Sequence, residues 1–205
     1  MNTYLHKEIR MELTERQKDI IMAGIAIIAN QGYEKLTTKN LATKIGVTEA
    51  ALYRHFKSKR DLVTTLLGYF EELSNKVLQE IREKDYSPLE SIRHFVEDRY
   101  ILFSEHPNLA KVMFSEELFK NDPTFKGQYQ CIMHKHKQVM ENYIIQAQQE
   151  GKIRSDLSPT QLFRIIVGSM RFTVTQWNLS DGAFDLKKEG SELIETIIKL
   201  IETKQ

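Results

Sequence analysis

Cysteine is nearly absent from this chain of 205 residues, since Cys131 stands alone and no intrachain disulfide can form. A chain of this length can bury a sizeable core without a disulfide or a metal. It has only four prolines and nine glycines and no low-complexity tract, which argues against a disordered or fibrous protein. We therefore expect a globular protein, and the scarcity of cysteine fits a reducing compartment.

Long apolar runs are also missing. The longest one falls far short of the roughly 20 residues that a membrane-spanning helix requires. Residues 1–13 mix charges with isolated apolar side chains and lack the continuous apolar segment of a secretory signal peptide. These absences predict a cytoplasmic protein that makes no membrane contact.

The net charge of +1 hides an uneven distribution of charge along the chain. Residues 1–60 contain 11 Lys and Arg against 6 Asp and Glu, which is +5, whereas residues 61–205 contain 18 against 22, which is −4. A basic segment favours binding to nucleic acid, because neutralised phosphates release their counterions. A chance fluctuation of surface charge explains the same numbers, so charge alone leaves both interpretations open.

Apolar side chains recur with helical periodicity, and no segment alternates as a strand would. A first helix is predicted over residues 14–30, with a buried stripe formed by Ile21, Gly24, Ile25 and Ile28. Two short helices follow, one that begins at Thr37 or Thr38 and stops at Gly46, and one over residues 49–56. Two short helices joined by such a turn have the spacing of a helix-turn-helix.

Ser58 is expected to cap a long fourth helix that continues through Ile81, with Asp61 completing a capping pair. Prolines and glycines divide the rest into helices over residues 89–105, 109–119, 124–150, 160–179 and 186–202. The predicted fold is all-α. It comprises an N-terminal three-helix helix-turn-helix domain over residues 1–60 and a larger helical effector-binding and dimerisation domain over residues 61–205.

One run of residues in the basic segment forms a recognisable pattern. It consists of Gly32-Tyr33, Leu36-Thr37-Thr38, Leu41-Ala42, Ile45-Gly46-Val47-Thr48 and Leu52-Tyr53-Arg54-His55-Phe56-Lys57-Ser58-Lys59. In this register the run resembles the N-terminal domain of the TetR/AcrR family of bacterial regulators. The resemblance implies a transcriptional regulator rather than an enzyme. It implies a homodimeric repressor that binds a palindromic operator in double-stranded DNA and is released by a small effector.

A recognition helix must show one face to its own domain and a polar face to the major groove. Leu52 and Phe56 are spaced to share the inward face. The DNA-binding surface is then expected to comprise Thr37, Thr38, Lys39, Thr48, Glu49, Ala50, Tyr53, Arg54, His55 and Lys59. In the family, residues that match His55 and Lys59 commonly contact phosphates.

Some of these positions have alternative roles. Tyr53 can equally pack on the first helix, and Thr37 and Thr38 can act as helix caps only. Glu49 can accept a hydrogen bond from a cytosine amino group, or it can favour the positive end of its own helix. The sequence does not decide between these roles.

Aromatic residues concentrate in the second part of the chain, with 13 of the 19 in residues 86–184. They can form an ordinary core or, as the resemblance implies, line a cavity for an apolar or amphipathic effector. The lining residues expected are Phe95, Arg99, Tyr100, Phe103, Met113, Phe114, Tyr129, Met133, Tyr143, Met170, Arg171 and Trp177. Arg99 and Arg171 are candidates to bind a ligand carboxylate, and they can equally be solvated or paired with nearby acids.

The last two helices carry apolar stripes that are wide enough to need a partner. In the family, the two C-terminal helices of each subunit form a four-helix dimer interface that places two recognition helices about 34 to 36 Å apart. The interface residues expected are Phe163, Ile166, Val167, Met170, Val174, Leu193, Ile197, Leu200 and Ile201.

No cofactor, catalytic set or metal site is expected. Cys131 and His134 have the spacing to share a helix face, but His136 points elsewhere, which argues against a metal site. No paired carboxylates or nucleophile–base pair supports an enzyme. A second function left open is that of a family member which acts through DNA and a protein partner in chromosome organisation, without a small-molecule effector.

Overall fold

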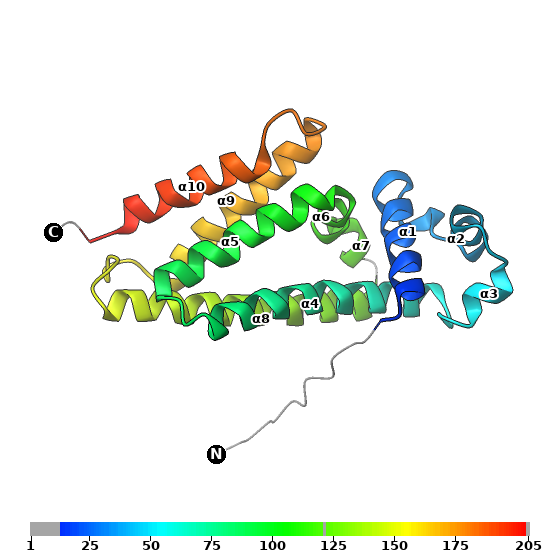
Figure 1. Ribbon diagram of the computed structural model, residues 1–205, viewed down its shortest axis with the longest axis horizontal. Helices are drawn as coiled ribbons and strands as arrows, with labels where there is room; N and C mark the ends of the chain where they lie inside the picture. The colour runs from blue at the N-terminus through cyan, green and yellow to red at the C-terminus, as the bar shows by residue number, and fades with distance from the viewer. Residues whose placement is uncertain (1–12, 121, 204–205) are drawn as a thin grey trace, which may run out of the picture.

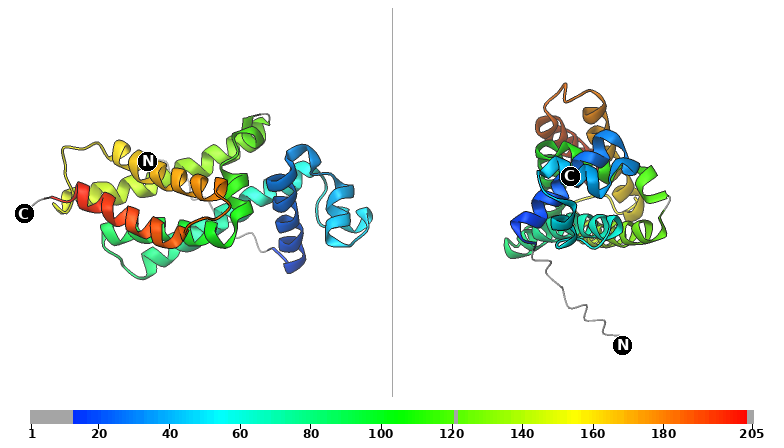
Figure 2. Two further views of the ribbon diagram at one scale, coloured as in Figure 1. Left: turned by 90° about the horizontal axis from the view of Figure 1, so that it is seen from above. Right: turned by 90° about the vertical axis from the view of Figure 1, so that its right-hand side faces the viewer.

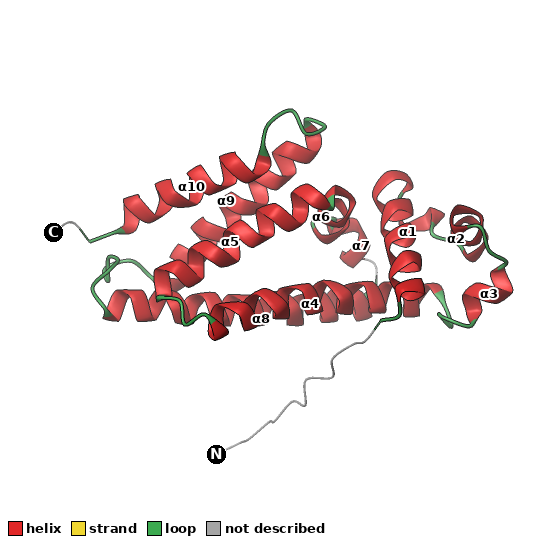
Figure 3. Cartoon of the chain, viewed as in Figure 1, coloured by secondary structure: helices red, strands yellow, loops and turns green. Residues whose placement is uncertain are grey.

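The computed structural model describes residues 13–120 and 122–203, and its regular elements in these ranges are helices. The expectation for residues 1–13 therefore falls, apart from Leu13, outside the described residues. The α-helices are α1 (Glu15–Gln31), α2 (Thr38–Ile45), α3 (Glu49–Tyr53), α4 (Lys59–Glu83), α5 (Pro88–Glu105), α6 (Pro107–Met113), α7 (Glu116–Lys120), α8 (Pro123–Gln149), α9 (Pro159–Leu179) and α10 (Leu186–Ile201) (Figures 1 and 3). The all-α prediction is confirmed.

Side-chain caps set the starts of the first helices. Thr37, Thr48 and Ser58 are the N-caps of α2, α3 and α4, and each hydroxyl accepts a backbone N–H from the first turn. The predicted capping pair at α4 is confirmed, because the Asp61 N–H donates to Ser58 Oγ at 3.0 Å. The Asp61 carboxylate in turn accepts from the Lys57 N–H at 2.8 Å, which fixes the chain as it enters the helix.

The first three helices pack around the beginning of α4 and form a head at one end of the molecule (Figures 1 and 2). The predicted stripe of α1 is buried, and it belongs to the same apolar core as Leu41, Leu52 and Phe56 from the two short helices and the turn that follows them. Gly24 allows a close approach here, since a Cβ at this position would lie 3.3 Å from Leu62 Cδ2. The head is thus tied to α4 by apolar packing.

Helices α4 and α8 lie side by side along the body, and α5, α9 and α10 complete it (Figure 1). The 25-residue α4 belongs to both parts, because it starts under the head and continues through the body. Helix α6 packs against α1 and so gives the body a second contact with the head. None of the helices in the described part of the chain is long and apolar enough to cross a lipid bilayer.

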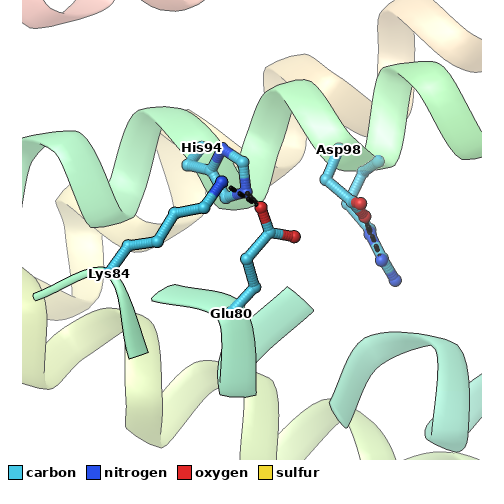
Figure 4. A network of polar contacts seen from close by, with 5 residues as sticks. Glu80, Lys84, His94 and Asp98 are labelled. Carbon is cyan, nitrogen blue, oxygen red and sulfur yellow. Dashed lines mark hydrogen bonds and ion pairs between the residues drawn. The ribbon is translucent and has the colours of Figure 1, made fainter. Parts of the chain in front are cut away.

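A polar contact joins α4 to α5 at the end of the body remote from the head. The Glu80 carboxylate accepts a hydrogen bond from Lys84 Nζ at 2.5 Å and lies 3.6 Å from His94 Nε2 (Figure 4). The hydrogen bond from Lys84 is the main cause that lowers the pKa of Glu80. One turn beyond His94, Asp98 pairs with the Arg99 guanidinium.

Two predicted helix ranges are wrong. The single helix expected over residues 109–119 is two helices, because the chain turns at Phe114 and Ser115, where Ser115 Oγ accepts the Leu118 N–H at 3.4 Å. The helix expected over residues 49–56 ends at Tyr53. Phe56 nevertheless reaches the core, since its N–H still bonds to Leu52 O at 3.0 Å.

Candidate functional site

The turn between α2 and α3 presents one face of α3 to solvent. Gly46 ends α2 in the left-handed region at φ 70°, which a glycine adopts without strain. Leu52 and Phe56 anchor α3 inward with exposures of 3% and 6%. The opposite face carries Tyr53, which is 54% exposed and therefore lies outside the buried core.

The ten residues expected to contact DNA lie on this head, but they are not equally accessible. Eight are exposed, namely Thr37, Lys39, Thr48, Glu49, Ala50, Tyr53, Arg54 and His55. Thr38 and Lys59 are half-buried. The exposed set forms a polar surface with three basic side chains, counting the histidine, on α2, α3 and the turn after α3.

Contacts within the head engage four of the polar side chains that the sequence assigned to DNA or to helix ends. Thr38 Oγ1 donates to Glu49 Oε2 at 2.5 Å, which joins α2 to α3. Thr37 and Thr48 accept backbone N–H groups at 3.1 and 3.2 Å. Thr37 is thus a cap, while Thr38 and Glu49 fix the relative position of the two helices.

Lys59 has a partner of its own. Its Nζ lies 3.6 Å from the centroid of the Tyr33 ring, a cation–π contact. Burial is the main cause that lowers the pKa of Lys59. The next residue, Arg60, pairs with Asp122 at the start of α8 at 3.0 Å. The beginning of α4 therefore links the head to the body.

A cavity of about 420 Å³ lies in the body between α4, α5, α8 and α9. This volume falls within the roughly 300 to 1,000 Å³ of typical ligand sites. Eight of the residues expected to line a pocket meet here: Phe95, Arg99, Phe103, Phe114, Tyr129, Met133, Met170 and Arg171. They come from α5, α8, α9 and the turn between α6 and α7.

The other four expected lining residues do not line this cavity. Tyr100 packs on α10, where a Cβ on Gly190 would lie 2.4 Å from its ring. The Trp177 indole donates to Phe184 O at 2.9 Å. Met113 lines a neighbouring hollow, and Tyr143 is half-buried further along α8. Aromatic and methionine content alone does not distinguish such core positions from a cavity wall.

Sequence reasoning missed seven lining residues, which are Phe70, Gln130, His134, His136, Lys137, Phe163 and Val167. Several of them were detectable, because residues 130, 133, 134 and 137 have the spacing of one helical stripe on α8. His134, which is exposed, and His136, which is half-buried, both line the cavity. No group of three His, Cys, Asp or Glu side chains suited to a metal occurs among the described residues.

The charged groups around the cavity are basic, and none of its lining residues is an acid. Arg99 is 3% exposed, and its Nη1 donates to Ser74 Oγ at 2.8 Å while its Nε donates to the Asp98 carboxylate at 3.0 Å. Burial lowers the pKa of Arg99. Burial and then the nearby Arg99 charge lower the pKa of His136 to about 4, so this imidazole is neutral at pH 7.

A second hollow of about 250 Å³ adjoins the cavity. Phe114, Tyr129 and Arg171 border both spaces. The remaining lining residues of the second hollow are Met113, Ser115, Glu116, Phe119, Lys120 and Lys126. Lys120 and Lys126 are exposed, so this hollow lies at the surface between α7 and the first turns of α8.

Most residues expected at a dimer interface are turned into their own chain. Ile166, Met170, Val174, Ile197 and Ile201 are buried, and Phe163 and Val167 line the cavity. Leu193 is half-buried, and Leu200 alone of the set is an exposed large apolar residue, at 71%. The apolar side chains that α9 does expose are Ile165, Phe172 and Leu179. The apolar stripes of α9 and α10 are wide in the sequence because each helix has apolar side chains both on its buried face and on its exposed face.

A helix-turn-helix head with a polar exposed face, joined by one long helix to an all-helical body, defines a DNA-binding transcriptional regulator. The family described as "Bacterial regulatory proteins, tetR family" matches residues 20–66. The family described as "YsiA-like protein, C-terminal region" matches residues 67–201. The chain therefore belongs to the TetR family, whose members are regulators and not enzymes.

Known proteins match most of the chain. It is 25% identical over 190 residues to the fatty acid metabolism regulator protein of Bacillus subtilis, covering 90% of this chain and 95% of that protein. It is 32% identical over 149 residues to the nucleoid occlusion factor SlmA of Marinobacter nauticus, covering 70% and 72%. The structure of FadR from Bacillus subtilis in complex with stearoyl-CoA superposes with a TM-score of 0.76 at 23% identity, covering 92% of this chain and 100% of that one.

Proposed function

We propose that this protein is a homodimeric repressor that binds a palindromic operator and leaves it when a long-chain fatty acyl compound enters the body. The observation that carries the proposal is the cavity of about 420 Å³, which aromatic and methionine side chains line beside basic groups and no acid. Such a wall suits an apolar chain with an anionic end. The likeness to a fatty acid metabolism regulator and to the FadR complex with stearoyl-CoA supports the same class of effector.

On the DNA side, the proposed contacts are divided between base reading and phosphate binding. Tyr53 and Arg54 face the major groove, with Ala50 allowing close approach. Lys39 and His55 contact bases or phosphates at the edges of the same surface. The Thr38–Glu49 hydrogen bond sets the angle between α2 and α3 and thereby the position of these side chains.

The proposed dimer places α9 and α10 of two copies against each other. Ile165, Phe172 and Leu179 follow one another at intervals of seven residues, so they share one side of α9. Leu200 extends the apolar surface to α10. We place the protein in the cytoplasm, where it meets DNA, and divide it near residue 60 into a DNA-binding and an effector-binding domain.

Operator binding in the presence of stearoyl-CoA tests this function. Promoter DNA recovered by genome-wide binding of the purified protein supplies the operator, and fluorescence anisotropy measures the affinity. We expect stearoyl-CoA to weaken operator binding at least tenfold. Tyr53→Ala should weaken it by roughly 1 to 3 kcal/mol while leaving binding to unrelated DNA nearly unchanged. Operator affinity that no long-chain acyl compound alters would contradict the effector role.

A second function has support from the likeness to nucleoid occlusion factors, one of which is 32% identical to this chain. In that case the protein acts in chromosome organisation through DNA and a protein partner, with no small effector. For this second function we expect that no member of a panel of fatty acids and their thioesters raises the melting temperature of the protein. We also expect that none of them changes its affinity for the operator. Stabilisation by any of these ligands favours the repressor function instead.

A further inference from the structure

The most deeply buried part of the cavity wall combines aromatic rings with two polar side chains. Phe70, Phe95 and Phe103 line the cavity and are each exposed by 3% or less. Arg99, also 3% exposed, has its guanidinium carbon 5.4 Å from the centroid of the Phe95 ring. The His136 ring packs against the same phenylalanine, with 5.6 Å between the ring centroids. A ligand that fills the cavity therefore meets two polar groups among the rings.

The charge of Arg99 already has a partner within the chain. Its Nε donates to the Asp98 carboxylate at 3.0 Å, and its Nη2 donates to the same carboxylate. Its Nη1 donates to Ser74 Oγ at 2.8 Å. An anionic ligand group at this point would have to compete with Asp98, which neutralises the guanidinium. This part of the wall is therefore suited to an uncharged group.

His136, by contrast, makes no hydrogen bond with the residues that the structure describes. Among those residues, the side-chain nitrogen that is sealed from solvent and lacks a partner is Nε2 of His94. Because His136 lines the cavity, its own ring nitrogens are open to that space. The ring is neutral at pH 7, since burial and then the Arg99 charge lower its pKa to about 4. A neutral imidazole has one nitrogen that donates a hydrogen bond and one that accepts.

We propose that His136 is a specificity-determining residue that hydrogen-bonds an uncharged hydroxyl or keto group on the apolar chain of the effector. The inference rests on the proposed function and deepens it, because it narrows the effector class to long-chain acyl compounds with an oxygen substituent on the chain. An unsubstituted chain would remove both imidazole nitrogens from water without supplying a hydrogen bond, which weakens binding. The site therefore favours the ligand that carries the matching oxygen.

Isothermal titration of the full chain tests the proposal. The ligands are stearic acid and a series of stearic acids that carry one hydroxyl or one keto group at different carbons, each below its micelle concentration. We expect at least one substituted acid to bind roughly tenfold more tightly than stearic acid. His136→Phe, whose ring takes the same place beside Phe70 and Phe95, should abolish that preference and bind stearic acid at least as tightly as the unaltered chain does.

Two further variants keep the test decisive. His136→Gln retains a donor and an acceptor, so it should keep a larger preference for the substituted acid than His136→Phe does. His94→Phe removes a histidine of α5 that does not line the cavity, and it should show the full preference.

Three results would overturn the role of His136 while leaving the proposed function intact. The preference could persist in His136→Phe, it could be lost equally in His94→Phe, or no substituted acid could bind more tightly than stearic acid. A chain that binds neither these acids nor stearoyl-CoA would overturn both the role of His136 and the proposed function.

Discussion

Gly190 illustrates how a single residue determines the packing of α10 on α5. A Cβ added there would lie 2.4 Å from the Tyr100 ring, which is itself buried at 2% exposure. We expect Gly190→Ala to lower the free energy of unfolding by about 1 to 3 kcal/mol through overpacking. Gly127→Ala in α8 is the matched control, because its Cβ meets nothing within 4 Å. There the gain in helix propensity should stabilise the chain by up to about 1 kcal/mol. Urea unfolding measures both free energies. If both variants stabilised the chain, or both destabilised it, the packing argument would be contradicted.

His136 should make the stability of the protein depend on pH. Its pKa is about 4 in the folded chain, against a reference value of 6.5. Below pH 6.5 the unfolded chain binds a proton that the folded chain does not bind until about pH 4, so stability falls across this interval. At pH 5 the loss relative to pH 7 is about 2 kcal/mol from this group.

The variant His136→Phe isolates this contribution from that of the carboxylates. The ring lies 6.2 Å from Phe70 and 5.6 Å from Phe95, so a phenylalanine fits the same surroundings. Urea unfolding at pH 7 and pH 5 should show a smaller loss of stability in the variant than in the unaltered chain. The same loss in both proteins would mean that His136 accepts a proton freely in the folded state.

Among the elements, the first turn of α8 is the one that connects the body to the head through polar contacts. Asp122 caps α8 through the Thr124 N–H at 2.9 Å and pairs with Arg60 at 3.0 Å. Phe125 meets the Tyr33 ring edge-on at 6.0 Å between centroids. Since Lys126 follows directly and borders the second hollow, this hollow lies next to the contacts that hold the head.

Arg60→Gln should therefore weaken the effect of the ligand on operator binding more than it lowers the free energy of unfolding. The Arg60 side chain is 65% exposed, so loss of the ion pair should cost about 1 kcal/mol or less. The factor by which stearoyl-CoA weakens operator binding should shrink several-fold, because one link between ligand and head is lost. Arg154→Gln, which breaks the exposed pair with Asp156, should leave that factor unchanged. An unaltered factor in Arg60→Gln would show that coupling runs through other contacts, such as those of α6 with α1.

Helix positions could be predicted from sequence wherever a capping residue and a glycine or proline marked both ends, as with Thr37 and Gly46 of α2. The break at Phe114 carried no such mark, so α6 and α7 were taken as one helix. The residues that line the cavity were harder to predict from sequence. A buried side chain on one face of a helix can lie opposite either an empty space or a neighbouring side chain, and the sequence does not distinguish the two. Tyr100 and Phe103 are both buried aromatics of α5, yet only Phe103 lines the cavity.

For the whole molecule, the proposed function as an operator-binding repressor requires two heads to be held at a fixed separation. A C2 dimer achieves this by pairing one surface with its own copy. The exposed apolar side chains of α9 and α10, Ile165, Phe172, Leu179 and Leu200, supply such a surface. The interface residues expected from sequence lie on the same two helices, and most of them are buried within the chain, because periodicity gives the width of a stripe but not which part of it the chain itself covers.

Phe172→Glu tests this arrangement, since Phe172 is 65% exposed in the single chain and would be buried in the dimer. We expect the unaltered protein to sediment at twice the 24.0 kDa of one chain and the variant to sediment as one chain. Operator affinity should fall by about 10²-fold or more, because the two half-sites are no longer bound by linked heads. Ile145→Glu on α8, a control at 40% exposure outside α9 and α10, should remain dimeric. A dimeric Phe172→Glu protein with full operator affinity would place the interface elsewhere on the body.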